Sequence, residues 1–298
     1  MKAYKGYGFF GPTTLKELFE GVSAFKGSIA FLAGGTDLII DLKKGIKKPE
    51  LVIDLSQIPE LSGVHEDNGI IHIGSGTTFS ELGRDPLVLK KGLCLAQAAR
   101  KIGSEQIRNR GTLGGNIASA SPAGDCLPVL LVLEAMITLQ RPEGIRRLPL
   151  SQVLKGSGLT CLAPNELITG IEFPLLDGEY VSGFEKLGSR TAVTVARLNL
   201  AVVIKYDRDN NFIKEARIAV GALGKTAFRL PELEKNLVGE INSSLFRQFE
   251  EMLTEAVDNA ISGRYSHPYK REAIRGMAED MFVSLFGSNS IPGGKTYG

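Results

Sequence analysis

The amino-acid sequence predicts an α+β protein with more than one domain. Its 298 residues suffice for about two domains at ~150 residues each. Strand and helix patterns alternate near the N-terminus, whereas later strand patterns are joined by hairpin turns, which is typical of an α+β organisation. Hydrophobic residues make up 43% and charged residues 23% of the chain. These values are ordinary for globular proteins and exclude extensive disorder.

Residues 1–57 are predicted to form a small α/β unit. Thr14 and Glu17 have the spacing of a capping box, so a helix should begin at this point. Residues 28–33 form a short apolar run that predicts a buried strand, and residues 51–55 predict a second strand.

A second helix is predicted directly after the first of these strands, which ends at Gly34 and Gly35. Thr36 can cap the start of this helix, and Asp37 is favoured there by the positive end of the helix dipole. Gly45 follows two lysines and suits the helix end. Residues 28–45 therefore predict a strand, a glycine turn and a helix.

Residues 58–176 are predicted to form an antiparallel sheet with helices. The tripeptide at residues 67–69, Asp-Asn-Gly, is a strong hairpin signal between two strand patterns. Further strand patterns cover residues 135–140, 145–148 and 166–173, and a strand pattern at residues 179–187, just past this region, is expected to belong to the same sheet. Helices are expected near residues 79–83, 92–102 and 125–134.

Beyond a break at residues 175–178, residues 177–287 are predicted to form a smaller C-terminal domain. Residues 198–206 and 212–220 predict two apolar strands, and two helices follow. The first helix should pack through Leu245, Phe249, Met252, Ala256 and Ala260. The second should pack through Ile274, Met277, Ala278, Met281 and Leu285. We expect a loose tail over residues 288–298, which are rich in Gly, Ser and Pro.

Charge and cysteine content exclude several classes of protein. The 35 basic and 33 acidic residues leave a net charge of +2, too small to favour a phosphate-backbone binder. The three cysteines have no CxxC spacing, so this chain alone is not expected to build a zinc or iron–sulfur site. The histidines also lack metal-ligand spacing. These residues are Cys94, Cys126, Cys161, His65, His72 and His267.

The chain is expected to be cytoplasmic. The sparse cysteines fit a reducing compartment. The N-terminal residues lack the apolar core of a secretory signal, and the apolar stretch at residues 127–137 is shorter than the ~20 residues that span a bilayer.

Two glycine segments carry the main functional signal. The first is LAGGTDL at residues 32–38; the second is GTLGGN at residues 111–116, followed by SPAGD at residues 121–125. Paired glycines let an anion approach backbone N–H groups, and a helix start adds partial positive charge. Together the segments could hold one pyrophosphate, although each pair could also be only a turn. Neither segment has the P-loop or the G-x-G-x-x-G pattern.

These segments resemble a known family. The sequences LAGGTDLIIDLKKG, IDLSQIPEL and IGSEQIRNRGTLGGNIASASPAGD are similar to the FAD-binding medium subunit of the molybdenum hydroxylases, such as xanthine, nicotinate and aerobic carbon monoxide dehydrogenases. The resemblance covers residues 3–285. It implies an FAD domain of the vanillyl-alcohol-oxidase type over residues 1–176, with subdomains of about 1–57 and 58–176, and a small α+β C-terminal domain.

The resemblance also implies roles for individual residues. Asp125 would contact sugar or ribityl hydroxyls, Ile102 and Ile168 would give apolar contacts, and Lys186 would lie beside the flavin as the candidate catalytic residue. The residues implied to hold the FAD pyrophosphate are Leu32, Ala33, Gly34, Gly35, Thr36, Asp37, Leu38, Gly111, Thr112, Gly114, Gly115 and Asn116.

Four side chains keep alternatives at this point. The Asp37 carboxylate would repel a pyrophosphate, so we expect it to turn away or to cap the helix start. Lys186 could equally be a solvated surface lysine. Arg108 and Arg110 could face either an FAD phosphate or a partner subunit.

The resemblance implies an electron-transfer function. Noncovalently bound FAD would pass electrons from the 2Fe-2S clusters of a small subunit to NAD or another acceptor, while a large molybdopterin subunit hydroxylates the substrate. A xanthine dehydrogenase-like complex is the leading expectation. The alternatives are a non-catalytic scaffold homologue and a free-standing flavin oxidoreductase.

Overall fold

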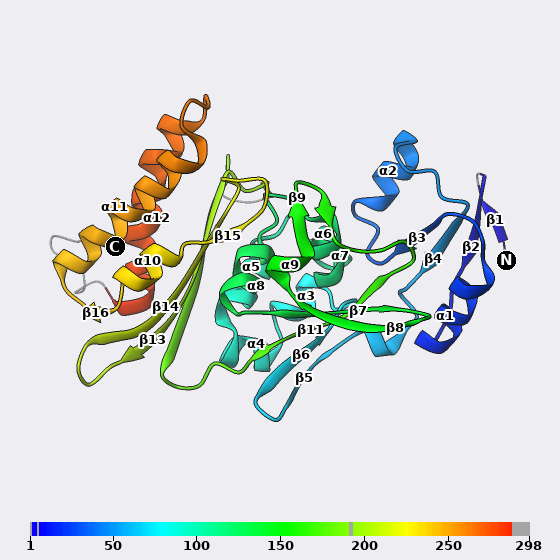
Figure 1. Ribbon diagram of the computed structural model, residues 1–298, viewed down its shortest axis with the longest axis horizontal. Helices are drawn as coiled ribbons and strands as arrows, with labels where there is room; N and C mark the ends of the chain where they lie inside the picture. Colours follow the sequence, from blue (N-terminus) through cyan, green and yellow to red (C-terminus); the bar gives the residue numbers. More distant parts are fainter. Residues whose placement is uncertain (1, 5, 191–192, 288–298) are drawn as a thin grey trace.

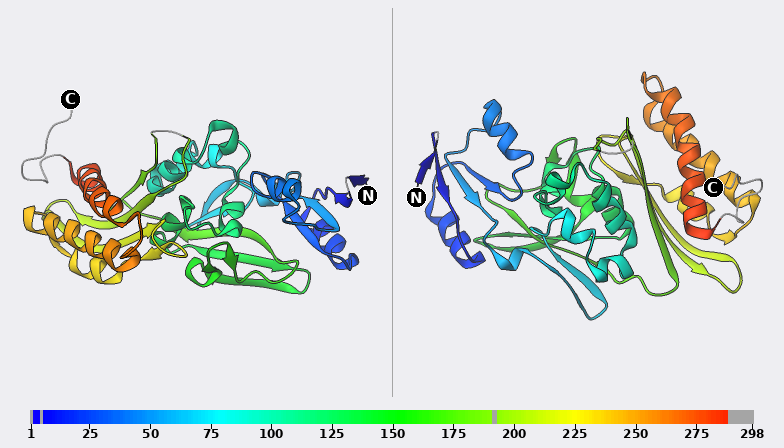
Figure 2. Two further views of the ribbon diagram at one scale, coloured as in Figure 1. Left: turned by 90° about the horizontal axis from the view of Figure 1, so that it is seen from above. Right: turned by 180° about the vertical axis from the view of Figure 1, so that it is seen from behind.

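Three regions of sheet and helix follow one another along the molecule (Figure 1). The computed structural model describes residues 2–4, 6–190 and 193–287. The N-terminal strands lie at one end and the two long C-terminal helices at the other in all views (Figure 1 and Figure 2). The tail predicted over residues 288–298 lies outside the described residues.

The N-terminal region contains a four-stranded sheet in the order β1-β2-β4-β3. Both neighbours of β4 run parallel to it. The strands are β1 (Lys2–Tyr4), β2 (Tyr7–Phe10), β3 (Ile29–Leu32) and β4 (Leu51–Asp54). The helices are α1 (Leu15–Ala24) and α2 (Leu38–Lys44). Both predicted helices form, and the predicted strands at residues 28–33 and 51–55 correspond to β3 and β4, whereas the sequence analysis missed β1 and β2.

The ends of these helices differ from the prediction in two details. The Thr14 hydroxyl accepts from the Glu17 backbone N–H, but the Glu17 carboxylate binds Thr13, so the capping box is only half formed. The N-cap of α2 is Asp37 rather than Thr36, and its side chain makes no cap bond. Local sequence located both helix starts, and the neighbouring side chains determined the capping partners.

The middle region contains a five-stranded antiparallel sheet in the order β5-β6-β11-β7-β8. Its strands are β5 (Val64–Asp67), β6 (Ile70–Gly74), β7 (Met136–Arg141), β8 (Gly144–Pro149) and β11 (Leu167–Pro174). Asn68 and Gly69 form the predicted turn, with φ angles of 50° and 77°. A separate antiparallel pair is formed by β9 (Leu154–Gly156) and β10 (Leu159–Thr160).

Seven α-helices and a 3-10 turn are described in the middle region. They are α3 (Phe79–Leu82), α4 (Pro86–Lys91), α5 (Leu93–Lys101), α6 (Glu105–Arg108), α7 (Leu113–Ser119), α8 (Cys126–Val132), α9 (Leu150–Val153) and the turn η1 (Pro59–Leu61). Every residue of α8 is buried. A helix that is apolar all round requires protein on all sides, and α8 packs against β13, β14 and β15 of the C-terminal region.

The C-terminal region contains a sheet in the order β12-β13-β14-β15, with β16 also pairing with β14. Its strands are β12 (Tyr180–Leu187), β13 (Leu198–Asp207), β14 (Phe212–Gly221), β15 (Phe228–Arg229) and β16 (Gly239–Glu240). Its helices are α10 (Pro231–Asn236), α11 (Ser243–Ile261) and α12 (His267–Phe286).

The expectation that residues 179–187 belong to the middle sheet is wrong. All eight residues of β12 pair with β13, and β11 already has β6 on one side and β7 on the other. The middle sheet therefore offers β12 no free edge beside β11.

The C-terminal sheet is buried on both faces, which explains the continuous apolar run of β13. Leu200 and Val202 belong to the core under α11 and α12. Ala201 and Val203 belong to the core that contains α5 and α8. This sheet thus joins the C-terminal helices to the middle region.

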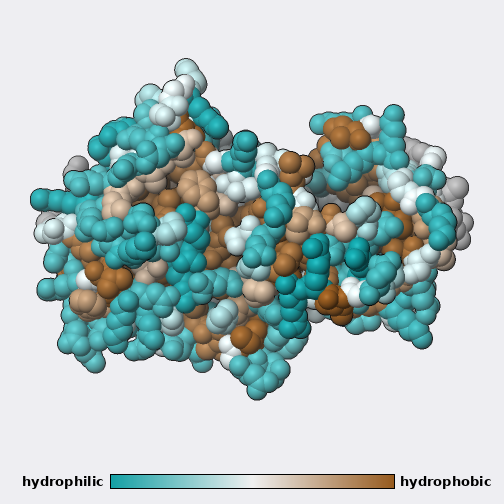
Figure 3. Space-filling model, in the orientation of Figure 1, coloured by the Kyte–Doolittle hydropathy of each residue, from teal (hydrophilic) through white to brown (hydrophobic). Residues whose placement is uncertain are grey.

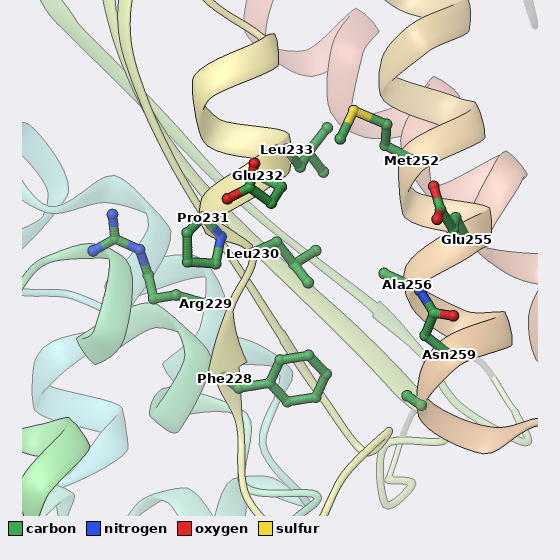
Figure 4. A pocket seen from close by; sticks show the side chains of 11 residues that line it. Phe228, Arg229, Leu230, Pro231, Glu232, Leu233, Met252, Glu255, Ala256 and Asn259 are labelled. Atoms are coloured by element: carbon green, nitrogen blue, oxygen red, sulfur yellow. The ribbon is translucent and has the colours of Figure 1, made fainter.

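The packing face of α11 is shifted from the predicted one. Its buried apolar residues are Leu245, Phe249, Leu253, Val257 and Ile261. Met252, Ala256 and Ala260 are only half-buried and line a groove of about 460 Å³ opposite Phe228, Leu230 and Leu233. Figure 4 shows the groove between its two walls, and Figure 3 shows apolar side chains reaching the surface over the C-terminal helices and the adjoining sheet. The shift arises because α11 packs mainly against α12, whereas it is α12 that lies directly on β12 and β13.

This shift predicts unequal effects of truncation in α11. Leu253→Ala should lower the free energy of unfolding by about 2–5 kcal/mol, because it opens a cavity in the core. Met252→Ala removes a similar volume from the groove and should cost much less. Urea unfolding of the full chain, followed by circular dichroism, measures both. Equal losses would contradict this description of the packing face.

Candidate functional site

The two predicted glycine segments lie against each other. A Cβ on Gly34 would overlap the carbonyl oxygen of Arg110 and lie 3.0 Å from the Gly111 Cα. The Ser119 hydroxyl donates a 2.6 Å hydrogen bond to the Asp37 carboxylate. The absence of a side chain at Gly34 thus allows direct backbone contact between segments that are about eighty residues apart. Of the two alternatives for the Asp37 side chain, capping of the helix start is not observed, because its carboxylate makes no cap bond and accepts from Ser119 instead.

The first segment presents a run of free backbone donors. Among the described residues, nothing accepts a hydrogen bond from the backbone N–H groups of Gly34, Gly35, Thr36, Asp37 or Leu38. Gly35 has a φ of +75°, a conformation that favours glycine. Successive free N–H groups at such a turn form a concave anion site, and the start of α2 adds partial positive charge. We call this run the N–H nest.

The second segment offers fewer free backbone N–H groups than its sequence suggests. The first four N–H groups of α7 already donate within the chain, so the expectation of free donors at this helix start is wrong. Their bonds run from Leu113 to Thr77 O, from Gly114 to Ser75 O, from Gly115 to Thr112 Oγ1 and from Asn116 to Thr112 O, at 2.8–3.1 Å. Glycine at position 114 is explained by packing, because a Cβ there would lie 2.6 Å from Ser75.

Asn116 and Gly115 remain suited to a ligand. The Asn116 Oδ1 atom is buried, and no hydrogen-bond partner for it exists in the described part of the chain. A buried polar atom without a partner is costly and calls for an explanation. A Cβ on Gly115 would approach only Thr112 Oγ1, at 2.9 Å. Gly115 therefore borders space that the protein itself does not fill. The Asn116 Nδ2 is a free donor, since no described atom accepts a hydrogen bond from it, whereas the buried Oδ1 can only accept.

A buried ion pair joins the middle region to the C-terminal sheet. Lys186 Nζ lies 2.5 Å from Asp125 Oδ2 and donates to the Lys101 carbonyl oxygen at 2.9 Å. The two side chains are only 5% and 6% exposed. The alternative that Lys186 is a solvated surface lysine is therefore wrong. Burial raises the pKa of the Asp125 carboxyl above its ordinary value, while Lys186 and Asn199 oppose that rise.

Asn199 is a site residue that the sequence analysis missed. It lies fully buried in β13, and its Nδ2 donates to Asp125 Oδ1 at 3.2 Å. Its own Oδ1 is buried, packs against the backbone of Gly221 and has no donor among the residues described. The available signal was an asparagine inside an otherwise apolar strand. Such a residue requires a partner when it is buried.

The predicted apolar contacts lie on different elements. Ile102 is half-buried at the end of α5, directly after Lys101, whose carbonyl binds Lys186. Ile168 is 3% exposed in β11, beside Thr169, whose carbonyl accepts from the backbone N–H of Ser75. Ile102 is therefore close to the ion pair, whereas Ile168 lies largely within the core.

The two arginines before the second segment differ. Arg108 donates to the carbonyl oxygens of Ile102 and Gly103, both at 3.1 Å, and so holds its own loop. The side chain of Arg110 is exposed. Both predicted alternatives for Arg110, an FAD phosphate and a partner subunit, therefore remain.

Two further kinds of feature, a metal-ligand cluster and a membrane-spanning helix, are absent from the described residues. Within residues 2–4, 6–190 and 193–287, no three or more His, Cys, Asp or Glu side chains are grouped so that they could hold a metal ion. None of the helices in the described chain has both the length and the apolar character required to cross a lipid bilayer.

Removing the Lys186 charge should make stability depend on pH in a definite direction. In Lys186→Met, Asp125 stays buried without its cation, so its pKa rises further. A carboxyl with a raised folded-state pKa stabilises the fold only below its unfolded pKa, and this contribution is lost as pH rises. The variant should therefore lose about 3–5 kcal/mol at pH 8 and clearly less at pH 5.

Thermal unfolding at pH 5, 6, 7 and 8 measures this dependence. Lys155→Met, at an exposed position, is the control and should follow the unmodified chain at each pH. An equal loss of stability at all four pH values would show that removal of Lys186 does not change the titration of Asp125.

Comparison with protein families gives two matches that together cover most of the chain. Residues 4–176 match the FAD binding domain in molybdopterin dehydrogenase. Residues 184–285 match the CO dehydrogenase flavoprotein C-terminal domain.

Individual relatives agree with these matches. The chain is 30% identical to the nicotinate dehydrogenase FAD-subunit of Eubacterium barkeri, over 94% of this chain and 96% of that protein. It is 32% identical to the glyceraldehyde dehydrogenase medium chain of Sulfolobus acidocaldarius, over 85% and 89% of the two chains. The fold is similar to that of a chain of carbon monoxide dehydrogenase from Hydrogenophaga pseudoflava, with a TM-score of 0.85, 25% identity and coverage of 98% and 100%. The chain therefore belongs to the FAD-binding subunits of the molybdenum hydroxylases, the molybdopterin dehydrogenase family.

Proposed function

We propose that this chain holds FAD noncovalently between its two glycine segments and serves as the electron-transfer subunit of a molybdenum hydroxylase complex. The observation that carries the proposal is the N–H nest of Gly34 to Leu38, placed against the second segment by the close backbone approach at Gly34. A pyrophosphate is the part of FAD that such a nest suits. The proposed FAD domain is of the vanillyl-alcohol-oxidase type.

The proposed roles follow from the donor groups that remain free. The nest and the Asn116 side chain would bind the pyrophosphate, and Gly115 would leave space for it. Asp125, held by Lys186 and Asn199, would contact hydroxyl groups of the cofactor, with Ile102 and Ile168 as apolar neighbours. When bound, FAD supplies a centre that exchanges one or two electrons. The chain's own task is to bind and orient it.

Lys186 is proposed to act electrostatically. Its charge is shared with Asp125 at 2.5 Å, so its effect on a neighbouring flavin depends on the ionisation of that pair. A positive charge near the flavin favours its anionic reduced form. This role makes Lys186 the proposed catalytic residue.

The proposed complex has a large molybdopterin subunit and a small subunit with 2Fe-2S clusters, and it is cytoplasmic. Names of similar proteins include nicotinate, glyceraldehyde and carbon monoxide dehydrogenases, so substrates differ among relatives. A xanthine dehydrogenase-like complex with NAD as acceptor is our specific proposal. A scaffold without cofactor is the alternative, but it leaves the free N–H groups of the nest unexplained.

Asn116→Ala should separate cofactor binding from folding. The substitution removes a buried oxygen without a partner, so the stability of the cofactor-free chain should be unchanged or higher. The affinity for FAD should fall about tenfold or more, because a hydrogen bond to a charged group contributes roughly 1.5–3 kcal/mol.

Titration of the cofactor-free chain with FAD, read by flavin fluorescence, measures this affinity. Asn259→Ala, at an exposed position in α11, is the control and should bind FAD like the unmodified chain. Unchanged FAD affinity in Asn116→Ala would remove Asn116 from the proposed site. A wild-type chain that takes up no FAD would favour the scaffold.

The isolated FAD-loaded chain should accept electrons but should not hydroxylate a substrate. Bleaching of the flavin absorbance by dithionite or NADH is the expected result, with acid releasing the flavin from the protein. Xanthine, nicotinate, aldehydes and carbon monoxide should leave the spectrum unchanged, because the hydroxylating centre is proposed to reside on another subunit. Substrate-dependent bleaching of metal-free protein would contradict this division of labour.

A further inference from the structure

The acidic side chain of the N–H nest is bound by a residue from the other glycine segment. Asp37 supplies one of the free N–H groups of the nest, but its carboxylate makes no cap bond at the start of α2. Instead, its Oδ2 atom accepts a 2.6 Å hydrogen bond from the Ser119 hydroxyl. Ser119 is the last residue of α7, the helix that begins in the second glycine segment. The bond therefore ties the only carboxylate within residues 34–38 to the opposite segment.

Helix stability does not account for this arrangement. A carboxylate is stabilised at the positive N-terminal end of a helix and destabilised at the negative C-terminal end. Asp37 lies at the N-terminal end of α2, yet its carboxylate is bound by a residue at the C-terminal end of α7. Asp37 is exposed, so burial does not force its carboxylate onto this one hydroxyl. The chain thus forgoes a favourable interaction between Asp37 and the start of its own helix.

The bond from Ser119 does affect the charge at the nest. The free N–H groups of Gly34 to Leu38 offer partial positive charge to an anion. A carboxylate that turned towards these groups would occupy the same donors as a phosphate and would repel it. While the Ser119 hydroxyl binds the carboxylate, the donors of the nest stay free.

We propose that Ser119 is a positioning residue for anion binding, whose hydroxyl holds the Asp37 carboxylate out of the N–H nest. Ser119 thereby prevents an acid of the site from competing with the phosphates that the site binds. The inference rests on the proposed function, because that function supplies the anion, the pyrophosphate of FAD. It explains how a nest that contains an acidic residue remains able to bind a ligand of the same charge.

Three variants distinguish this role from a direct contact between Ser119 and the ligand. Ser119→Ala releases the carboxylate, so the affinity for FAD should fall about fivefold or more. This loss should shrink as salt is raised, because the charge of an exposed carboxylate is screened. Asp37→Asn keeps an acceptor for Ser119 but has no charge, and it should bind FAD at least as tightly as the unmodified chain. The double variant Ser119→Ala/Asp37→Asn should bind FAD like Asp37→Asn, because no charge is left to compete.

Titration of the cofactor-free chains with FAD, read by flavin fluorescence, measures these affinities. Ser119→Thr retains a hydroxyl and should bind FAD like the unmodified chain. Ser151→Ala, at an exposed position in α9, is the matched control and should also leave the affinity unchanged. Urea unfolding of each cofactor-free variant tests whether a change in affinity reflects a loss of folded protein.

The double variant decides between the two roles of Ser119. If it binds FAD as weakly as Ser119→Ala, the proposal is overturned and Ser119 contacts the ligand directly. Unchanged affinity in Ser119→Ala would overturn it as well.

Inorganic pyrophosphate separates this inference from the proposed function. If the unmodified chain takes up no FAD, the proposed function fails, and calorimetric titration with pyrophosphate then tests the nest alone. The same order of affinities among the variants would support the role of Ser119. Absence of pyrophosphate binding by that chain and by Asp37→Asn would overturn it.

Discussion

The buried ion pair between Asp125 and Lys186 is the interaction on which the candidate site and the position of the C-terminal sheet both depend. A carboxylate at the start of α8 can be buried only because β12 brings an ammonium group to 2.5 Å from it and β13 adds the Asn199 amide. Breaking such a pair leaves an uncompensated charge inside the protein, which is far costlier than losing a surface pair. The C-terminal sheet is therefore part of the site: it supplies two of the three side chains in this cluster.

The two glycine segments perform different physical tasks, although their sequences look alike. Gly34 and Gly114 are glycines because another part of the chain occupies the space of a side chain. Gly35 is a glycine because its backbone has a positive φ. The result is one segment with free N–H groups and a second that supports it and offers Asn116. In the proposed anion site, the first segment would supply the N–H groups and the second would supply the Asn116 side chain.

Family membership and site geometry contribute separate information about function. The family matches identify an FAD-binding subunit of molybdenum hydroxylases. They do not identify a substrate, because similar proteins are named for nicotinate, glyceraldehyde and carbon monoxide. The distribution of free hydrogen-bond donors within this chain indicates which residues could hold a ligand. It places free backbone N–H groups in the first glycine segment, directly beside the second.

The sequence by itself determined the mixed strand and helix composition, the Asn68–Gly69 hairpin and the two glycine segments, because these features depend on local backbone preferences and on short motifs. It also indicated the family through those motifs. Tertiary structure decided the rest. Whether the first N–H groups of α7 are free depends on Ser75 and Thr77, which are distant in sequence, and the partner of β12 depends on which sheet has an open edge. Lys186 could be judged buried, and Asn199 recognised as part of the site, only once the folded chain had brought both to Asp125, since burial and charge pairing are properties of neighbours in space.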